Sequence, residues 1–137
     1  MNKNKSYSEL DLKWKDEYNT SISEIDYQHQ YFLSLVKRIT DIITDTNNHI
    51  YCHRLFTELI YYAQFHFYSE ETIMIKCNYG DINNHKEMHR DLIDLLTNEI
   101  NSMSDNMADY QHFIQFLLKW FVRHTMEEDK KIAACMK

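Results

Sequence analysis

The sequence predicts an all-α protein, an up-down-up-down bundle of four helices preceded by an N-terminal arm. The chain has 137 residues, the size of one domain. It contains one Gly and no Pro, where average usage gives about ten and about seven. Since hairpins, bulges and rigid turns depend on these residues, sandwiches, barrels and Gly-rich nucleotide-binding loops are disfavoured. Hydrophobic residues make up 44% of the chain, which is enough to fill a core.

Turn-forming residues divide the chain into an arm, residues 1–20, and a bundle domain, residues 21–137. The breaks fall at Asn47-Asn48, at Asn78-Tyr79-Gly80-Asp81 and at Ser102-Met103-Ser104-Asp105-Asn106. The helical segments that remain are 22–46, 49–77, 83–101 and 107–133. Because the connections between them are short, consecutive helices are expected to be antiparallel neighbours.

Each segment carries core residues spaced three and four apart, which is the period of a helix with one buried face. The first segment opens with Ser21-Ile22-Ser23-Glu24, which fits a capping box. Gly80 is a natural residue after the end of the second. In chain order, the stripes contain Ile25, His29, Phe32, Val36, Ile39 and Ile43; Cys52, Leu55, Leu59, Tyr62, His66, Glu70, Ile73 and Cys77; His85, His89, Leu92, Leu96 and Ile100; and Phe113, Leu117, Phe121 and His124.

Charge and hydropathy narrow the choice of partners and compartment. The formal net charge of −6 disfavours nucleic acid, which needs a basic patch. No apolar run reaches the roughly 18–20 residues that span a membrane, and the first residues lack the apolar region of a secretory signal. We therefore expect a cytoplasmic protein. In a reducing compartment Cys52, Cys77 and Cys135 are expected to be free thiols, two of them buried.

Six polar side chains occupy stripe positions where the pattern demands apolar ones. Five are histidines and the sixth is a carboxylate: His29, His66, His85, His89, His124 and Glu70. A single histidine on the buried face of a helix is usually a core residue whose ring nitrogens have hydrogen-bond partners. Six unsatisfied polar groups would cost a few kcal/mol each, comparable to the stability of a whole domain. A bound metal satisfies all of them with one common partner.

The spacing of these residues supports metal binding. His66 and Glu70, like His85 and His89, are four residues apart, so both members of a pair can reach one cation. Imidazole suits zinc, iron, copper or nickel, and carboxylates favour octahedral ions. Five nitrogens are too many for one tetrahedral zinc ion but fit two metals bridged by carboxylates. The remaining histidines, His49, His53 and His112, are interpreted as surface residues.

The pattern resembles the hemerythrin family, in particular its single-domain bacteriohemerythrins. The matching motifs come in the family's order and span about residues 14–132. They are Trp14; Ile25-Asp26-Tyr27-Gln28-His29; His66-Phe67-Tyr68-Ser69-Glu70-Glu71-Thr72-Ile73-Met74; His85-Lys86-Glu87-Met88-His89; and Trp120-Phe121-Val122-Arg123-His124, followed by Asp129.

The resemblance implies a non-haem di-iron centre inside the bundle. Three histidines would bind one iron and two the other, while two carboxylates and an oxo or hydroxo group would bridge them. The first iron would then be six-coordinate and the second five-coordinate, which leaves one position where O2 could bind. The implied ligands are His85, His89 and His124 for the first iron, His29 and His66 for the second, and Glu70 and Asp129 as bridges.

Simple helical spacing favours Glu128 or Glu127 over Asp129, because Asp129 lies five residues after His124. The resemblance selects Asp129, and a local π-bulge would bring it onto the inner face. Gln28 and Glu71 adjoin ligands and could accept hydrogen bonds from them, although solvated helix-face positions fit the sequence equally well. Phe121 is a candidate wall of the O2 pocket or an ordinary core aromatic.

Reversible O2 binding, for storage, delivery or protection, is the leading functional hypothesis. The chain shows no nucleophile–base pair and no cofactor loop, so we expect no enzymatic turnover. The alternatives are a sensor or interaction module responding to O2, nitric oxide or redox state, a di-iron oxidase or iron-donating repair protein, and a zinc-filled structural bundle. A monomer served by an unidentified reductase or redox partner is expected, with no membrane or nucleic-acid partner.

Overall fold

Four long antiparallel helices form the molecule, as the sequence predicts. The computed structural model describes residues 13–43 and 49–136, with the backbone alone at residues 122 and 125–127. The helices are α1 (Ser23–Ile42), α2 (His49–Lys76), α3 (Ile82–Ser102) and α4 (Met107–Arg123), and a π-helical stretch (His124–Asp129) joins α4 to the short α5 (Lys130–Cys135). A 3-10 turn over Asp16–Tyr18 precedes α1.

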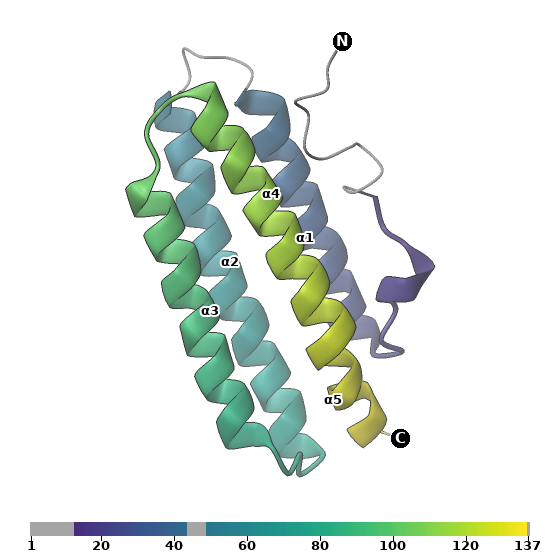
Figure 1. The fold of residues 1–137 in the computed structure, drawn as a ribbon. Coiled ribbons are helices and arrows are strands. Elements are labelled where there is room, and N and C mark those ends of the chain that lie inside the picture. Colours follow the sequence, from purple (N-terminus) through teal and green to yellow (C-terminus); the bar gives the residue numbers. More distant parts are fainter. Residues whose placement is uncertain (1–12, 44–48, 137) are drawn as a thin grey trace.

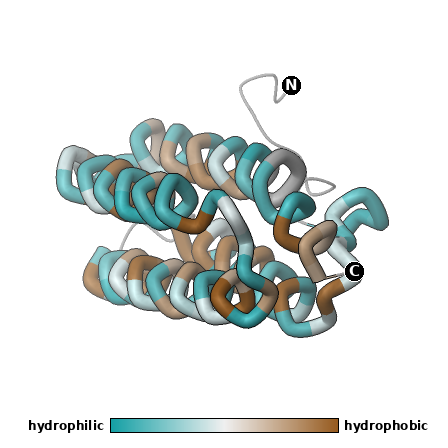
Figure 2. Tube along the Cα trace, turned by 90° about the horizontal axis from the view of Figure 1, so that it is seen from below, coloured by the Kyte–Doolittle hydropathy of each residue, from teal (hydrophilic) through white to brown (hydrophobic). Residues whose placement is uncertain are grey.

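The helices run side by side, with the α2–α3 connection at one end of the bundle and the α3–α4 connection at the other (Figure 1). Seen from below, each helix alternates between hydrophobic and hydrophilic positions as its faces turn inward and outward (Figure 2). Within the described ranges there is no strand, and none of the helices found there is both long and apolar enough to cross a membrane. The predicted break at Asn47-Asn48, the end of the first segment at 44–46 and the arm residues 1–12 lie outside the described residues. The division at residue 20 stays a prediction.

The start of α1 is fixed by different residues from the predicted capping box. Ile22 is the N-cap, without a side-chain cap hydrogen bond, and Ser21 takes a left-handed backbone conformation, with φ 73°. Thr20 supplies the polar contacts instead: its backbone N–H and its hydroxyl both donate to Asp26 Oδ1 at 2.9 Å. The capping-box prediction was wrong because the chain turns sharply at Ser21, which places Thr20 over the first helical turn.

The end of α2 is closed by Asn78 and not by Gly80. Asn78 has the left-handed φ of 58°, and no Gly has a positive φ. The Tyr79 N–H bonds the Met74 carbonyl at 2.8 Å and the Asn78 N–H bonds the Ile75 carbonyl at 3.2 Å. This is the Schellman arrangement, in which Asn can replace Gly. The role expected of Gly80 is therefore taken by Asn78.

The interior has three layers along the bundle axis. The upper layer is a large apolar cluster to which all four long helices contribute, for example through Phe32, Phe67, Leu96 and Phe121. The lower layer is a smaller cluster formed by Ile25, Ile73, Met74 and Ile132. Buried histidines and carboxylates lie along α1, α2, α3 and the π-helical stretch that continues α4, at the level between these two clusters. The helix packing thus positions a polar layer between two dry ones.

A disulfide links Cys77, just after α2, to Cys135 at the end of α5. The prediction of three free thiols was wrong for these two, whereas Cys52 is buried and forms no disulfide. Because successive long helices are antiparallel, α2 and α5 run in the same direction, and their C-terminal ends lie together although the two cysteines are 58 residues apart in sequence. Residue spacing along one helix does not reveal this proximity. The bond fastens the C-terminal segment that carries Asp129.

Reduction of this disulfide should destabilise the fold. For a loop of this length, loop-closure entropy gives roughly 4 kcal/mol, and measured values are commonly about 2–4 kcal/mol. Urea unfolding with and without dithiothreitol should therefore show a lower midpoint in the reductant. A Cys135→Ser variant should start at the lower value and not respond to the reductant, whereas a Cys52→Ala variant should respond like the parent chain. Identical midpoints for the oxidised and reduced chain would contradict the link.

Candidate metal centre

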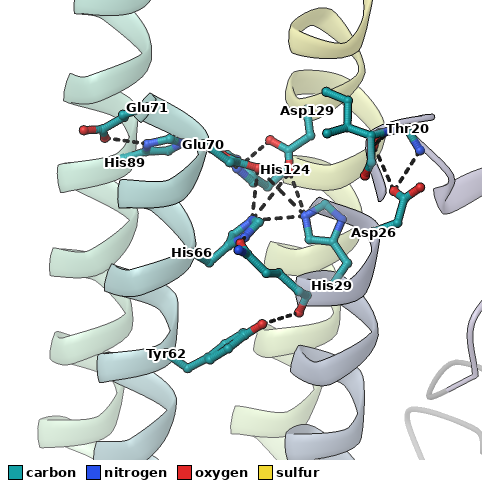
Figure 3. Close-up of polar contacts among 12 residues, drawn as sticks. Thr20, Asp26, His29, Tyr62, His66, Glu70, Glu71, His89, His124 and Asp129 are labelled. Atoms are coloured by element: carbon teal, nitrogen blue, oxygen red, sulfur yellow. Dashed lines mark hydrogen bonds and ion pairs between the residues drawn. The ribbon is translucent and has the colours of Figure 1, made fainter. Parts of the chain in front are cut away.

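The polar layer gathers the seven side chains that the sequence singled out. They come from α1, α2, α3 and the π-helical stretch that continues α4, and all are at least 93% buried: His29, His66, Glu70, His85, His89, His124 and Asp129. Their inward-pointing arrangement is visible for the labelled members in Figure 3. The ligand atoms form two groups, within each of which all atoms lie within 4.8 Å of one another.

The first group consists of three histidines and one carboxylate, namely His85, His89, His124 and Glu70. Glu70 Oε1 lies 3.1 Å from His89 Nε2 and 3.4 Å from His124 Nε2. His85 and His89 are one turn apart on α3, with ring centroids 4.8 Å apart. Three imidazoles from two helices therefore converge on one side of Glu70.

The second group consists of two histidines and two carboxylates, namely His29, His66, Glu70 and Asp129. The Nε2 atoms of His29 and His66 are 3.1 Å apart. Glu70 Oε2 lies 3.0 Å from His66 Nε2, and Asp129 Oδ2 lies 2.8 Å from His29 Nε2. This group thus has one histidine fewer than the first.

Each carboxylate faces both groups with a different oxygen. Glu70 directs Oε1 to the first group and Oε2 to the second. Asp129 places Oδ1 2.9 Å from His124 Nε2 and Oδ2 2.8 Å from His29 Nε2. This is the arrangement expected of two carboxylates that bridge a pair of cations.

Several of these atoms are buried close to one another without making hydrogen bonds. They include His85 Nε2, His89 Nε2, Glu70 Oε2 and both carboxylate oxygens of Asp129. Burying a polar atom without a hydrogen-bond partner lowers the stability of the fold. Within each group the ligand atoms lie within 4.8 Å of one another, so that one cation could contact all of them. Nitrogen and oxygen donors in this arrangement fit two metal ions of intermediate hardness such as iron.

The π-helix explains how Asp129 reaches the site. Over His124–Asp129 the backbone is π-helical, and because a π-turn bonds residues five apart, Asp129 comes onto the same face as His124. The expected local widening is confirmed. Glu128, the choice from regular spacing, instead pairs with Lys131 Nζ at 3.3 Å.

Two of the buried histidines form a hydrogen bond to a neighbouring side chain through the second ring nitrogen, which is one of the two possibilities considered from the sequence. His66 Nδ1 donates to Gln28 Oε1 at 2.7 Å, and His89 Nδ1 donates to Glu71 Oε2 at 2.8 Å. These hydrogen bonds fix each ring and leave its Nε2 free for a metal. The Tyr62 hydroxyl donates to the Gln28 carbonyl at 2.7 Å, a contact that the sequence pattern, which made Tyr62 a core residue, did not reveal.

The carboxylates control protonation in the layer. Burial alone would lower the pKa of His66, but the nearby negative charges of Glu70 and Asp129 outweigh it and raise the pKa to about 9. His124 responds in the same way, with its pKa raised to about 10. His85 lies farther from the carboxylates, and burial followed by repulsion from His89 lowers its pKa.

Both carboxyl groups are held ionised. Burial would raise the pKa of Glu70, yet the charge of His66 and hydrogen bonds from the surrounding groups lower it well below its usual value. The pKa of Asp129 is also lowered: burial and the Glu70 charge oppose ionisation, but the contacts with His124 favour it. The layer therefore holds two negative charges ready for cations.

A small cavity adjoins the polar layer. Its volume is about 10 Å³, and its lining includes two histidines of the second group, His29 and His66, and one of the first, His124, together with the rings of Phe32 and Phe121. This is the scale of a single small molecule. Phe121 packs edge-on against His29, with ring centroids 5.5 Å apart. Its position therefore fits the predicted pocket wall, while its other ring contacts, with Phe32 and Tyr18, also make it a core residue.

The other three histidines lie away from this layer. His112 is exposed. His49 and His53 are half-buried and contact the α3–α4 connection and the start of α4: His49 Nδ1 lies 2.9 Å from the Tyr110 hydroxyl, and His53 Nε2 lies 2.6 Å from Asp105 Oδ1. Both side chains are therefore partly exposed, and each has a hydrogen-bonding partner on a neighbouring element.

The fold and the site together define a class: a four-helix bundle whose interior holds two linked groups of potential metal ligands. The family model for the Hemerythrin HHE cation binding domain matches residues 20–135. The chain therefore belongs to the hemerythrin family.

Individual relatives agree with this assignment. A bacteriohemerythrin of Clostridium acetobutylicum is 25% identical over 130 residues, covering 86% of this chain and 95% of the relative. One from Methylococcus capsulatus is 29% identical over 121 residues, covering 88% and 92%. A crystal structure of a hemerythrin mutant superposes with a TM-score of 0.78 and 27% identity, covering 90% of this chain and 95% of that one.

Metal loading at neutral pH should release protons. The raised pKa values of His66 and His124 mean that both imidazoles are protonated at pH 7 in the metal-free chain, whereas metal ligands must be neutral. Calorimetric titration with ferrous iron in buffers of different ionisation enthalpy should report about two protons released per chain. Because the pKa values are raised, the release should persist at pH 8 and diminish above pH 9. Loading without proton release at pH 7 would contradict this electrostatic account.

Proposed function

We propose that this chain binds O2 reversibly at a pair of non-haem iron ions, serving O2 storage, delivery or protection. The observation that carries the proposal is the placement of Glu70 and Asp129 between the two sets of histidines. Glu70 has one oxygen near His89 and His124 and the other near His66, while Asp129 has one oxygen near His124 and the other near His29. In this proposal the two groups each hold one iron. Family membership supports the choice of metal.

The unequal histidine count gives the two ions different tasks. We assign His85, His89 and His124 to the ion that is more fully held by protein. His29 and His66 hold the other, and both line the small cavity beside Phe121. When bound, ferrous ions supply the electrons with which O2 is held.

The surrounding residues keep the ligands ordered and water out. Gln28 and Glu71 orient the rings of His66 and His89 through short hydrogen bonds. Phe121 and Phe32 stack with centroids 5.2 Å apart and cover the cavity with apolar surface. An apolar cavity beside fixed ligands favours release of O2 over irreversible oxidation of the ferrous ions by O2, which protons and water assist. We propose no catalytic turnover.

The proposal is tested by cycling O2 over anaerobic, ferrous-loaded protein. The parent chain should bind two irons and show a visible charge-transfer band that disappears when O2 is pumped off. His66→Ala and Glu70→Ala should each lose at least about half of the bound iron and the band, because each removes a buried donor that no neighbour replaces. His112→Ala is the matched control and should behave like the parent chain.

The outcomes separate the functional alternatives. Full iron loading in His66→Ala would contradict the ligand assignment. Two irons with irreversible oxidation would contradict reversible binding and favour a sensor or redox role. O2 consumption beyond stoichiometry in the presence of a reductant would favour an oxidase.

A further inference from the structure

The outer face of α1 and α2 carries a row of large exposed aromatic side chains that the metal centre does not use. We call it the aromatic stripe: Tyr27 and Tyr31 on α1, and Tyr51, Tyr61, Phe65 and Tyr68 on α2. Between 43% and 73% of each side chain is exposed. Scattered exposed apolar residues are ordinary, but six aromatic side chains on one face form a patch of the kind that marks an interaction site.

Helical spacing and ring contacts connect the members of the stripe. Tyr61, Phe65 and Tyr68 are spaced four and three residues apart on the face of α2 opposite its buried stripe. Tyr62 bridges the two helices, with its ring 4.8 Å from Tyr31 and 6.0 Å from Phe65. The longest helix, α2, is therefore apolar on both sides, where a helix of a simple monomer needs only one apolar face.

The stripe carries almost no net charge, although the chain is acidic. The sequence has no Asp, Glu, Lys or Arg between Glu58 and Glu70. Arg38 and Glu58 at its margin neutralise each other, because Arg38 donates to Glu58 Oε2 at 2.9 Å, while the Tyr31 hydroxyl accepts a hydrogen bond from Arg38 at 3.2 Å. The exposed Arg54, which lies between Tyr51 and Tyr61 along α2, leaves a small positive charge. Depletion of charge and enrichment in aromatic residues are the marks of an interface core.

We propose that the aromatic stripe is a self-association surface, through which two copies of this chain form a twofold-symmetric dimer. A twofold interface pairs a patch with itself, and a neutral aromatic patch can do so without opposing like charges. The rest of a chain of formal net charge −6 would oppose such contact. The absence of a basic cluster among the residues of the stripe argues against an anionic lipid surface as the occupant.

The available area matches what a stable dimer needs. From their exposed fractions, the six side chains present about 700 Å² of aromatic surface per chain, close to the roughly 800 Å² per partner of a standard interface. From the sequence we expected a monomer, whereas the exposed aromatic stripe favours a dimer. The proposed dimer is independent of what the metal centre binds.

The test is the mass of the iron-loaded, full-length protein in solution, measured by sedimentation equilibrium over a dilution series. The parent chain should have twice the 16.7 kDa chain mass. Phe65→Glu and Tyr68→Glu should each raise the dissociation constant of the dimer about 30-fold or more, the scale for loss of one aromatic hot spot. Glu is a good helix former, so α2 should persist.

Matched controls keep the outcome interpretable. Leu95 on α3 is also exposed, and Leu95→Glu should remain dimeric. Tyr27→Glu on α1 repeats the test without altering α2. Iron content and helicity equal to those of the parent chain will show that each variant is folded. A monomeric parent chain at every concentration, or a Tyr68→Glu variant as dimeric as Leu95→Glu, would overturn the proposal.

Discussion

The structure depends on one constraint, the burial of a layer of charged and polar side chains inside an apolar bundle. Glu70 and Asp129 are completely buried, and five histidines surround them. Each uncompensated group would cost a few kcal/mol, so the helices must hold the donors in register around common cations. This demand is met in the same way by α1, α2 and α3, and by α4 together with the π-helical stretch and α5, with apolar residues on both sides of each polar contribution.

The two carboxylates explain both the stability of this layer and its affinity for metal. In the metal-free chain they retain protons on His66 and His124, which partly neutralises the buried charge. Cations can replace those protons without rearranging the ligands, because each carboxylate already faces both groups. The π-helix that delivers Asp129 and the disulfide that fastens the end of α5 both position this one residue.

The sequence predicted what periodicity encodes: the four helices and the inward direction of the polar residues. For Gln28 and Glu71 the sequence fitted hydrogen bonding and solvated positions equally well, and the folded chain gives each of them a histidine partner. The sequence did not predict contacts that depend on how helices align along the bundle axis, such as the Cys77–Cys135 bond or the Tyr62 hydroxyl on the Gln28 carbonyl. Local backbone choices also escaped it, since Asn78 and Gly80 are both acceptable after a helix, and only the folded chain selects Asn78.

The most direct test of the central claim is anomalous diffraction at the iron absorption edge from crystals of the iron-loaded protein. The account predicts two anomalous peaks per chain. One should lie among His85, His89 and His124 and the other beside His29 and His66, with Glu70 and Asp129 contacting both. A single peak, or two peaks that do not share these carboxylates, would contradict a bridged pair of ions and the function proposed from it.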